Sequence, residues 1–169
     1  MTATGELDLS YGPAARPGGS DGGGLRALPE GFGRLAYLPG RGLRKLVLGT
    51  SGNGELGTVP EGLWSMVALE ELCLMACGRT ELPEGIGQLT GLRKLNLGVN
   101  GELTALPEGL WSLAALEELN LMNCRLTALP GRVAAFLRKG VGRKAYPRAG
   151  GQLFTWSLTP SGEPLSEVG

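Results

Sequence analysis

The stretch from Leu43 to Leu137 is written twice, and this duplication constrains the fold more than any other feature. A segment that begins LRKLVLGTSGNGELGTVPEGLW is followed by one that begins LRKLNLGVNGELTALPEGLW, and each copy divides into two units. The units begin at Leu43, Leu69, Leu92 and Leu116, at spacings of 26, 23 and 24 residues. A period in the low twenties with leucines at fixed places is typical of solenoids, because so short a unit buries its apolar face only against its neighbours.

Each unit predicts one strand and one helical turn. The shared pattern is L-x-x-L-x-L-x-x-(N/C)-x-L-x-x-L-P-x-x-(I/L)-x-x-L. Around L-x-L, leucines alternate with variable residues, and this period of two predicts a short strand with one apolar face. Pro60, Pro83 and Pro107 then stand where a helical turn begins, since proline suits a first helical position that needs no N–H donor. The strands must therefore run parallel on one side of an arc, with the helical turns on the other.

These motifs resemble the intracellular leucine-rich-repeat family, in particular the L-P-x-x-I/L type of Ras-group and Scribble-like scaffolds. The match covers residues 43–137, and Arg79 departs from it at a position where leucine is usual. The resemblance implies an α/β leucine-rich-repeat solenoid, a right-handed βα superhelix with about five short parallel strands on its concave face. It also implies protein binding through that face, although a fold alone does not determine function.

Three segments are expected along the chain. Residues 1–24 combine a degenerate first strand, Glu6–Ser10, with a Gly/Pro-rich insertion, and a disordered tail is the alternative there. Residues 25–137 form the repeat domain. Residues 138–169 form a basic linker, whose cations are expected to be solvated, and then a cap strand or a free tail. The strand pattern is the alternation of Phe154, Trp156 and Leu158 with polar residues, and such a strand would cover the last apolar layer.

Charged residues alternate in sign from one expected strand to the next. The position before each central leucine holds, in order, Glu6, Lys45, Glu71, Lys94 and Glu118. The preceding position repeats the alternation in Arg44, Glu70, Arg93 and Glu117. Equivalent residues on neighbouring parallel strands lie about 4.8 Å apart, so opposite charges would meet along the sheet. Exposed pairs add little stability, and their expected effect is to fix the strand register.

The variable residues of the concave face form the expected protein-binding surface. They are Lys45, Val47, Glu71, Cys73, Met75, Lys94, Asn96, Glu118, Asn120 and Met122. The two methionines offer adaptable apolar contacts inside a polar rim, which suits an irregular protein surface. A merely solvated sheet is the alternative for the same residues.

Tryptophan alternates with small residues on the opposite side of the arc. The residue after each helical-turn hydrophobe is Gly33, Trp64, Gly87, Trp111 or Ala134 in successive units. A tryptophan that lies against a glycine of the next unit buries its ring without meeting another ring. Structural packing is therefore favoured over an aromatic docking site.

The sequence lacks the residues that metal sites and common catalytic sites need. The chain has no histidine and three cysteines, so neither a four-ligand zinc site nor a Ser-His or Cys-His nucleophile pair is expected. Gly52–Gly57 fits G-x-G-x-x-G, but its duplicate Asn100–Thr104 keeps only the N-G-E-L core, and a repeat turn explains both copies better than a nucleotide site does. We therefore expect no cofactor, no metal and no catalysis. Asn53, Asn100, Cys77 and Cys124 at the N/C position are expected to bond to main-chain groups of the turns.

The charge balance also narrows the class of partner. Lys and Arg total 16, as do Asp and Glu, and this balance argues against a nucleic-acid partner. The sequence shows neither a membrane-spanning run nor a signal-peptide pattern, so a cytoplasmic protein without membrane contact is expected. We expect a monomeric, non-catalytic protein-interaction module; whether two arcs pair is open. The alternatives are a regulatory segment of a larger signalling enzyme, such as a GTPase or kinase, and a nucleotide-binding protein using Gly52–Gly57.

Overall fold

The computed structural model describes in full the residues 5–9, 28–29, 31–32, 34, 42–49, 56 and 59–126, together with the backbone of two strands at 144–149 and 152–153. The Gly/Pro-rich insertion, nearly all of Gly52–Gly57, and the expected strand pattern of Phe154–Leu158 lie outside the described residues.

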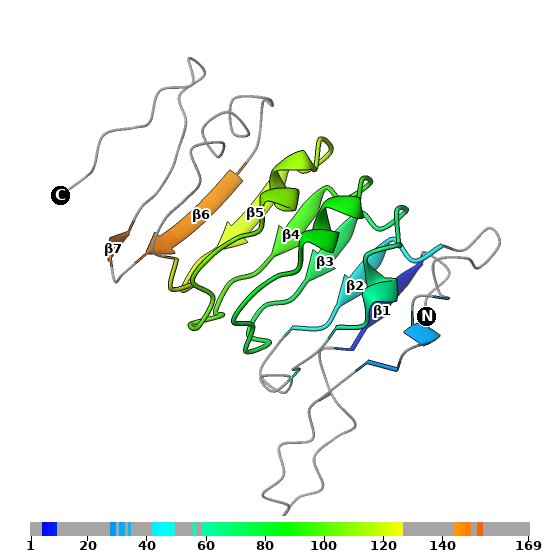
Figure 1. Ribbon diagram of the computed structural model, residues 1–169, viewed down its shortest axis with the longest axis horizontal. Helices are drawn as coiled ribbons and strands as arrows, with labels where there is room; N and C mark the ends of the chain where they lie inside the picture. The colour runs from blue at the N-terminus through cyan, green and yellow to red at the C-terminus, as the bar shows by residue number, and fades with distance from the viewer. Residues whose placement is uncertain are drawn as a thin grey trace, which may run out of the picture.

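Within the described residues, seven strands form one sheet whose spatial order is the chain order (Figure 1). The strands are β1 Glu6–Asp8, β2 Lys45–Val47, β3 Glu71–Cys73, β4 Lys94–Asn96, β5 Glu118–Leu121, β6 Lys144–Ala149 and β7 Gln152–Leu153. β1 to β6 pair in parallel, and β7 is antiparallel to β6. The five expected parallel strands are β1 to β5. The sixth, β6, lies in the segment that the sequence assigns to a basic linker.

Each central leucine pairs with the central leucine of the next unit. Leu46 pairs with Leu72, Leu72 with Leu95, and Leu95 with Leu119. All four side chains are buried, with exposed fractions between 0% and 3%. The register predicted from the leucine period is therefore confirmed, and the interior is one continuous stack of leucine layers. Since every layer is closed by the layers on both sides, the units fold as one body.

Short 3-10 helices form the side opposite the sheet (Figure 1). They are η2 Glu61–Leu63, η3 Glu84–Gln88 and η4 Glu108–Ser112. Each follows its expected proline, which has extended backbone angles at the N-cap. One unit also caps the next, because the Glu84 carboxylate accepts hydrogen bonds from the main-chain N–H groups of Glu108 at 3.1 Å and Gly109 at 2.6 Å. Such contacts satisfy donors that a helix of this length leaves without an internal partner.

The turn after β4 is organised by a buried asparagine. The Asn100 side chain is 1% exposed. Its Oδ1 accepts the N–H groups of Cys77 at 3.1 Å and Arg79 at 3.0 Å, and its Nδ2 donates to the carbonyls of Leu74 at 2.9 Å and Leu97 at 2.6 Å. The role expected for the N/C position is thus confirmed for Asn100, while Asn53 lies outside the described residues.

Cysteines occupy the same position in the units where asparagine is absent. The Cys77 thiol donates to the Met75 carbonyl at 3.6 Å, and the Cys124 thiol donates to the Leu97 carbonyl at 3.2 Å. Burial raises the pKa of the Cys77 thiol to about 11, and burial also raises the pKa of Cys124. Both side chains therefore act as neutral donors inside the turns.

Arg79 is a cation at a position where the repeat usually has leucine, and its hydrogen bonds to the main chain explain why it is tolerated there. Its side chain is buried, and its guanidinium donates to the main-chain carbonyls of Leu56 at 3.3 Å and Glu81 at 3.5 Å. Burial is the main cause of its lowered pKa. The guanidinium thus bonds to backbone of its own unit and of the preceding one, which an apolar leucine cannot do.

Trp64 packs against a glycine of the next unit, but not against the expected one. The Trp64 side chain is 4% exposed, and a Cβ atom at Gly85 would lie 3.2 Å from its ring atoms Cδ1 and Cγ. Gly87, the expected neighbour, instead faces the Gly109 carbonyl. The offset arises because the ring leans over the first turn of η3, where Gly85 lies, rather than over its end. Trp111 is half-buried against the same core, as packing predicts.

Candidate protein-binding surface

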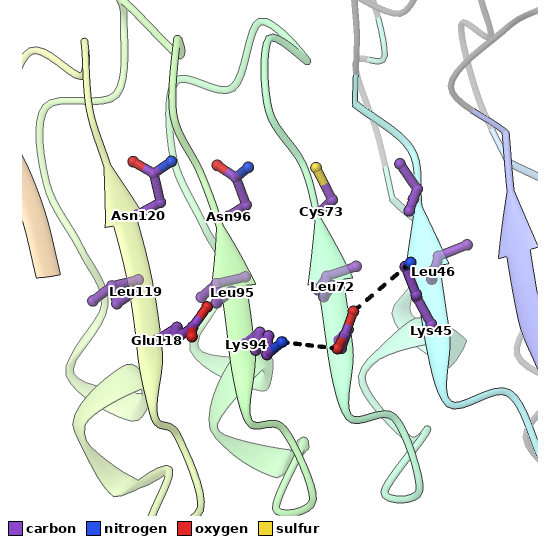
Figure 2. A pocket seen from close by; sticks show the side chains of 12 residues that line it. Lys45, Leu46, Leu72, Cys73, Lys94, Leu95, Asn96, Glu118, Leu119 and Asn120 are labelled. Atoms are coloured by element: carbon purple, nitrogen blue, oxygen red, sulfur yellow. Dashed lines mark ion pairs between the residues drawn. The ribbon is translucent and has the colours of Figure 1, made fainter. Parts of the chain in front are cut away.

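The solvent side of β2 to β5, opposite the 3-10 helices, is called here the concave sheet face. A shallow groove of about 290 Å³ crosses it (Figure 2). The groove is lined by four leucines, Leu46, Leu72, Leu95 and Leu119, and by eight variable residues: Lys45, Val47, Glu71, Cys73, Lys94, Asn96, Glu118 and Asn120. The parallel register thus brings eight of the ten expected contact residues onto one surface. They come from four units that are far apart in the sequence.

The lower row of the groove is a ladder of alternating charges. Lys45 Nζ lies 2.7 Å from a Glu6 carboxylate oxygen. Figure 2 shows the next two pairs, in which Lys45 Nζ lies 3.9 Å from one Glu71 oxygen and Lys94 Nζ lies 3.3 Å from the other. Glu118 follows Lys94 in the register. A hydrogen bond from Lys45 to Glu6 is the main cause of the raised pKa of Lys45. The opposite signs meet along the sheet as the sequence predicts.

The ladder continues beyond the units from which it was predicted. In the register between β5 and β6, Glu118 pairs with Lys144. The register of the row therefore extends from Glu6 through Lys45, Glu71, Lys94 and Glu118 to the position of Lys144 in β6. The leucine pattern did not identify Lys144 because no repeat surrounds it. The available signal was the sign alternation, which favours a cation after Glu118.

A second charged row precedes the first by one residue. An Arg44 guanidinium nitrogen lies 2.8 Å from Glu70 Oε1, and Arg93 donates to Glu117 Oε1 from Nε at 2.9 Å and from a terminal nitrogen at 2.6 Å. Hydrogen bonding to Glu117 is the main cause of the raised pKa of Arg93. These side chains are between 36% and 64% exposed, so the pairs order the surface more than they stabilise the fold.

The upper row of the groove holds Val47, Cys73, Asn96 and Asn120 in register. The two asparagines also shape the turns that follow their strands. Asn96 Oδ1 accepts the N–H of Gly98 at 3.0 Å, and Asn120 Oδ1 accepts the N–H of Met122 at 2.9 Å. Their positions are therefore fixed from within the protein, which leaves them ordered at the surface.

Met75 and Met122 do not line the groove with the other expected contact residues. β3 ends at Cys73 and β5 at Leu121, so both methionines lie in the turns beyond the strands. Met75 is half-buried and accepts a hydrogen bond at Sδ from Asn96 Nδ2 at 3.8 Å, whereas Met122 is 40% exposed. The strands end before these residues because the main chain turns there, with positive φ at Ala76 and Asn123.

Among the described residues, no group of three or more His, Cys, Asp or Glu side chains is arranged to hold a metal ion. No helix in the described part of the chain has the length and apolar character needed to cross a membrane. All three cysteines are free thiols, and Cys73, the one on the concave sheet face, is half-buried.

No protein-family model matches this sequence, and no curated protein matches it. Solved structures do. A leucine-rich-repeat protein of Leptospira interrogans is 29% identical with a TM-score of 0.54, and the match covers 72% of this chain and 34% of that one. The leucine-rich-repeat domain of the type III effector XopL is 26% identical with a TM-score of 0.56, covering 72% of this chain and 38% of that one. The chain thus spans little more than a third of the length of these structures.

The fold is accordingly a leucine-rich-repeat solenoid of the α/β class. The similar structures, the parallel sheet and the leucine layers agree on this point.

Proposed function

We propose that this chain is a non-catalytic protein-interaction module that binds a partner protein through the concave sheet face. One observation carries the proposal: eight variable side chains from four units meet on one ordered groove while the leucines between them are buried. Leucine-rich-repeat neighbours support an interaction module in general. The L-P-x-x-I/L motif favours the Ras-group or Scribble-like scaffold type.

The mechanism is binding by a surface that is ordered in advance. Buried leucines hold the strands, ion pairs hold the long charged side chains, and Asn96 and Asn120 are bonded to their own turns. Association with such a surface loses little conformational entropy. Because both signs alternate at close spacing, the face favours a partner that offers both signs over a polyanion.

A second candidate function is a regulatory segment of a larger signalling enzyme, such as a GTPase or kinase. The observation that favours it is length, since this chain matches only 34% and 38% of the two similar structures. Nucleotide binding at Gly52–Gly57 has less support. In the duplicate turn the Asn100 amide is used entirely on main-chain groups, as a structural turn requires.

Affinity capture tests the proposal. Wild type is compared with a Glu71→Lys/Glu118→Lys variant, which reverses two charges of the groove. The matched control is Glu61→Lys/Glu108→Lys, which makes the same charge change at exposed positions of η2 and η4 on the opposite side. We expect the specific partner to be lost with the first variant and kept with the control. If every captured protein survives the first variant while circular dichroism shows an intact fold, the concave sheet face is not the binding surface.

A further inference from the structure

We propose that the concave sheet face binds a second copy of this chain, in a face-to-face dimer whose two-fold axis runs parallel to the strands between β3 and β4. The inference rests on the proposed function, since it names a partner for the same surface. It departs from the monomer that composition alone led us to expect. What carries it is the order of the charges across the sheet.

The charge ladder is complementary to its own reversal. Its four members that line the groove read Lys, Glu, Lys, Glu from β2 to β5. An alternating row with an even number of members changes every sign when it is reversed. A two-fold axis at its midpoint therefore places Glu71 opposite Lys94 of the second copy and Lys45 opposite Glu118. The midpoint lies between Glu71 and Lys94, between β3 and β4.

The second charged row has the same midpoint as the first. It reads Arg44, Glu70, Arg93, Glu117 from β2 to β5, again alternating and again even in number. Its midpoint also falls between β3 and β4, so reversal sets Arg44 opposite Glu117 and Glu70 opposite Arg93. An axis parallel to the strands reverses strand order while it keeps each row opposite itself. A two-fold axis across the strands would keep the order and set like charges against like.

The spacing of the ladder also selects the kind of surface that can match it. Neighbouring members lie about 4.8 Å apart, the separation of strands in a sheet. Side chains on one face of an extended strand recur at about 6.7 Å, and those on one face of a helix at about 5–6 Å. Across the three intervals from Lys45 to Glu118 a strand falls out of step by about 6 Å. A second sheet, crossed strand by strand, keeps step over the full row, and this chain carries one with the required order of signs.

The expected association is weak and depends on salt. The row is about 14 Å long at this strand spacing, and its pairs stay partly hydrated, so each contributes little. Both partners present the same patch, as an isologous interface requires. Each Lys and Glu of the row keeps its oppositely charged neighbours on the adjacent strands of its own chain. In the dimer it also faces an opposite charge of the second copy.

Two single substitutions test the geometry. Lys94→Glu sets two carboxylates against each other at both central contacts of a homodimer, and Glu71→Lys sets two ammonium groups against each other there. Each variant alone should be monomeric where wild type dimerises. An equimolar mixture of the two should dimerise again, because two carboxylates at the centre of one chain then face two ammonium groups at the centre of the other. The measurement is sedimentation velocity on the full chain at high micromolar concentration, at about 20 mM and about 300 mM salt.

The controls separate this pairing from general attraction between oppositely charged variants. Glu102 and Arg125 form an exposed pair in the turns, at 3.8 Å, outside the groove. Glu102→Lys carries the same net charge as Glu71→Lys, yet it should keep its own homodimer and should not rescue Lys94→Glu. Circular dichroism and melting temperature confirm that each variant is folded.

The results distinguish this inference from the proposed function. A wild-type chain that stays monomeric at low salt, or a dimer that survives Lys94→Glu unchanged, overturns the dimer. Rescue by Glu102→Lys overturns the assigned contacts. If the wild-type chain is monomeric while Glu71→Lys/Glu118→Lys still abolishes capture of a foreign protein, the dimer alone fails. If capture is indifferent to that double variant, the proposed function fails.

Discussion

Replacing Asn100 by alanine should destabilise the fold more than any other polar substitution at the described turns. The amide makes four hydrogen bonds, to the N–H groups of Cys77 and Arg79 and to the carbonyls of Leu74 and Leu97, at 2.6 to 3.1 Å. The side chain is 1% exposed, so water does not replace these bonds without opening the turn. Alanine leaves two donors and two acceptors buried without that partner.

The magnitude follows from the count of bonds. A buried hydrogen bond contributes about 1 kcal/mol net, and a buried group left unsatisfied costs about 1–3 kcal/mol. Four such groups, partly relieved by relaxation of the turn, give an expected loss of about 4 kcal/mol in the free energy of unfolding. Asn100→Cys should cost less, since Cys77 and Cys124 hold the same position in neighbouring units and each thiol donates to a main-chain carbonyl.

Urea denaturation followed by circular dichroism measures the effect. The midpoint should fall for Asn100→Ala with the slope unchanged, because the same surface is exposed on unfolding. Asn120→Ala is the matched control: its half-exposed side chain makes one hydrogen bond to the Met122 N–H, and its loss should cost about 1 kcal/mol. A loss for Asn100→Ala no larger than that of Asn120→Ala would refute the claim that the buried amide holds the turns together.

Three further predictions concern the turns and the 3-10 helices. Val99 has φ of 61° and is 47% exposed, whereas Asn occupies the equivalent position 123 at φ of 58°. Val99→Asn should therefore relieve backbone strain and raise the melting temperature by about 2–4 °C. A melting temperature below that of wild type would contradict the strain argument. Glu84→Ala removes the carboxylate that caps η4 and should lower the stability by about 1 kcal/mol, whereas Glu81→Ala, an exposed residue before η3, should leave it nearly unchanged. Burial raises the Cys77 pKa from 9.0 to about 11, so between these pH values the folded state keeps a thiol proton that the unfolded state loses. The free energy of unfolding should therefore fall as the pH rises through this window. Its slope against pH should flatten in Cys77→Ala, and an unchanged slope would show that the thiol is not the source.

The leucine period could predict most of the candidate site. Once L-x-L is a strand and each unit packs against the next, parallel pairing and the partners of Leu46, Leu72 and Leu95 are determined. A shift of the pairing by one residue would move every leucine from the interior to the solvent-exposed face. The same register places Lys45 beside Glu71 and Glu71 beside Lys94. Even the turn role of Asn100 follows from its place in the repeat, since a buried turn needs partners for its main-chain groups.

Other features depended on where each strand ends and on how neighbouring units pack, and the leucine period predicts neither. Met75 and Met122 lie beyond the groove because β3 and β5 have ended before them. Trp64 contacts Gly85 rather than Gly87 because the direction of a ring depends on packing against the next unit. Lys144 joins the ladder from a segment without leucines, where only pairing with β5 defines a strand. The sequence by itself thus determined the order and register of the repeats, since that order is set by local burial of leucine. The tertiary structure decided which side chains share one surface and where that surface stops, since these depend on contacts between units.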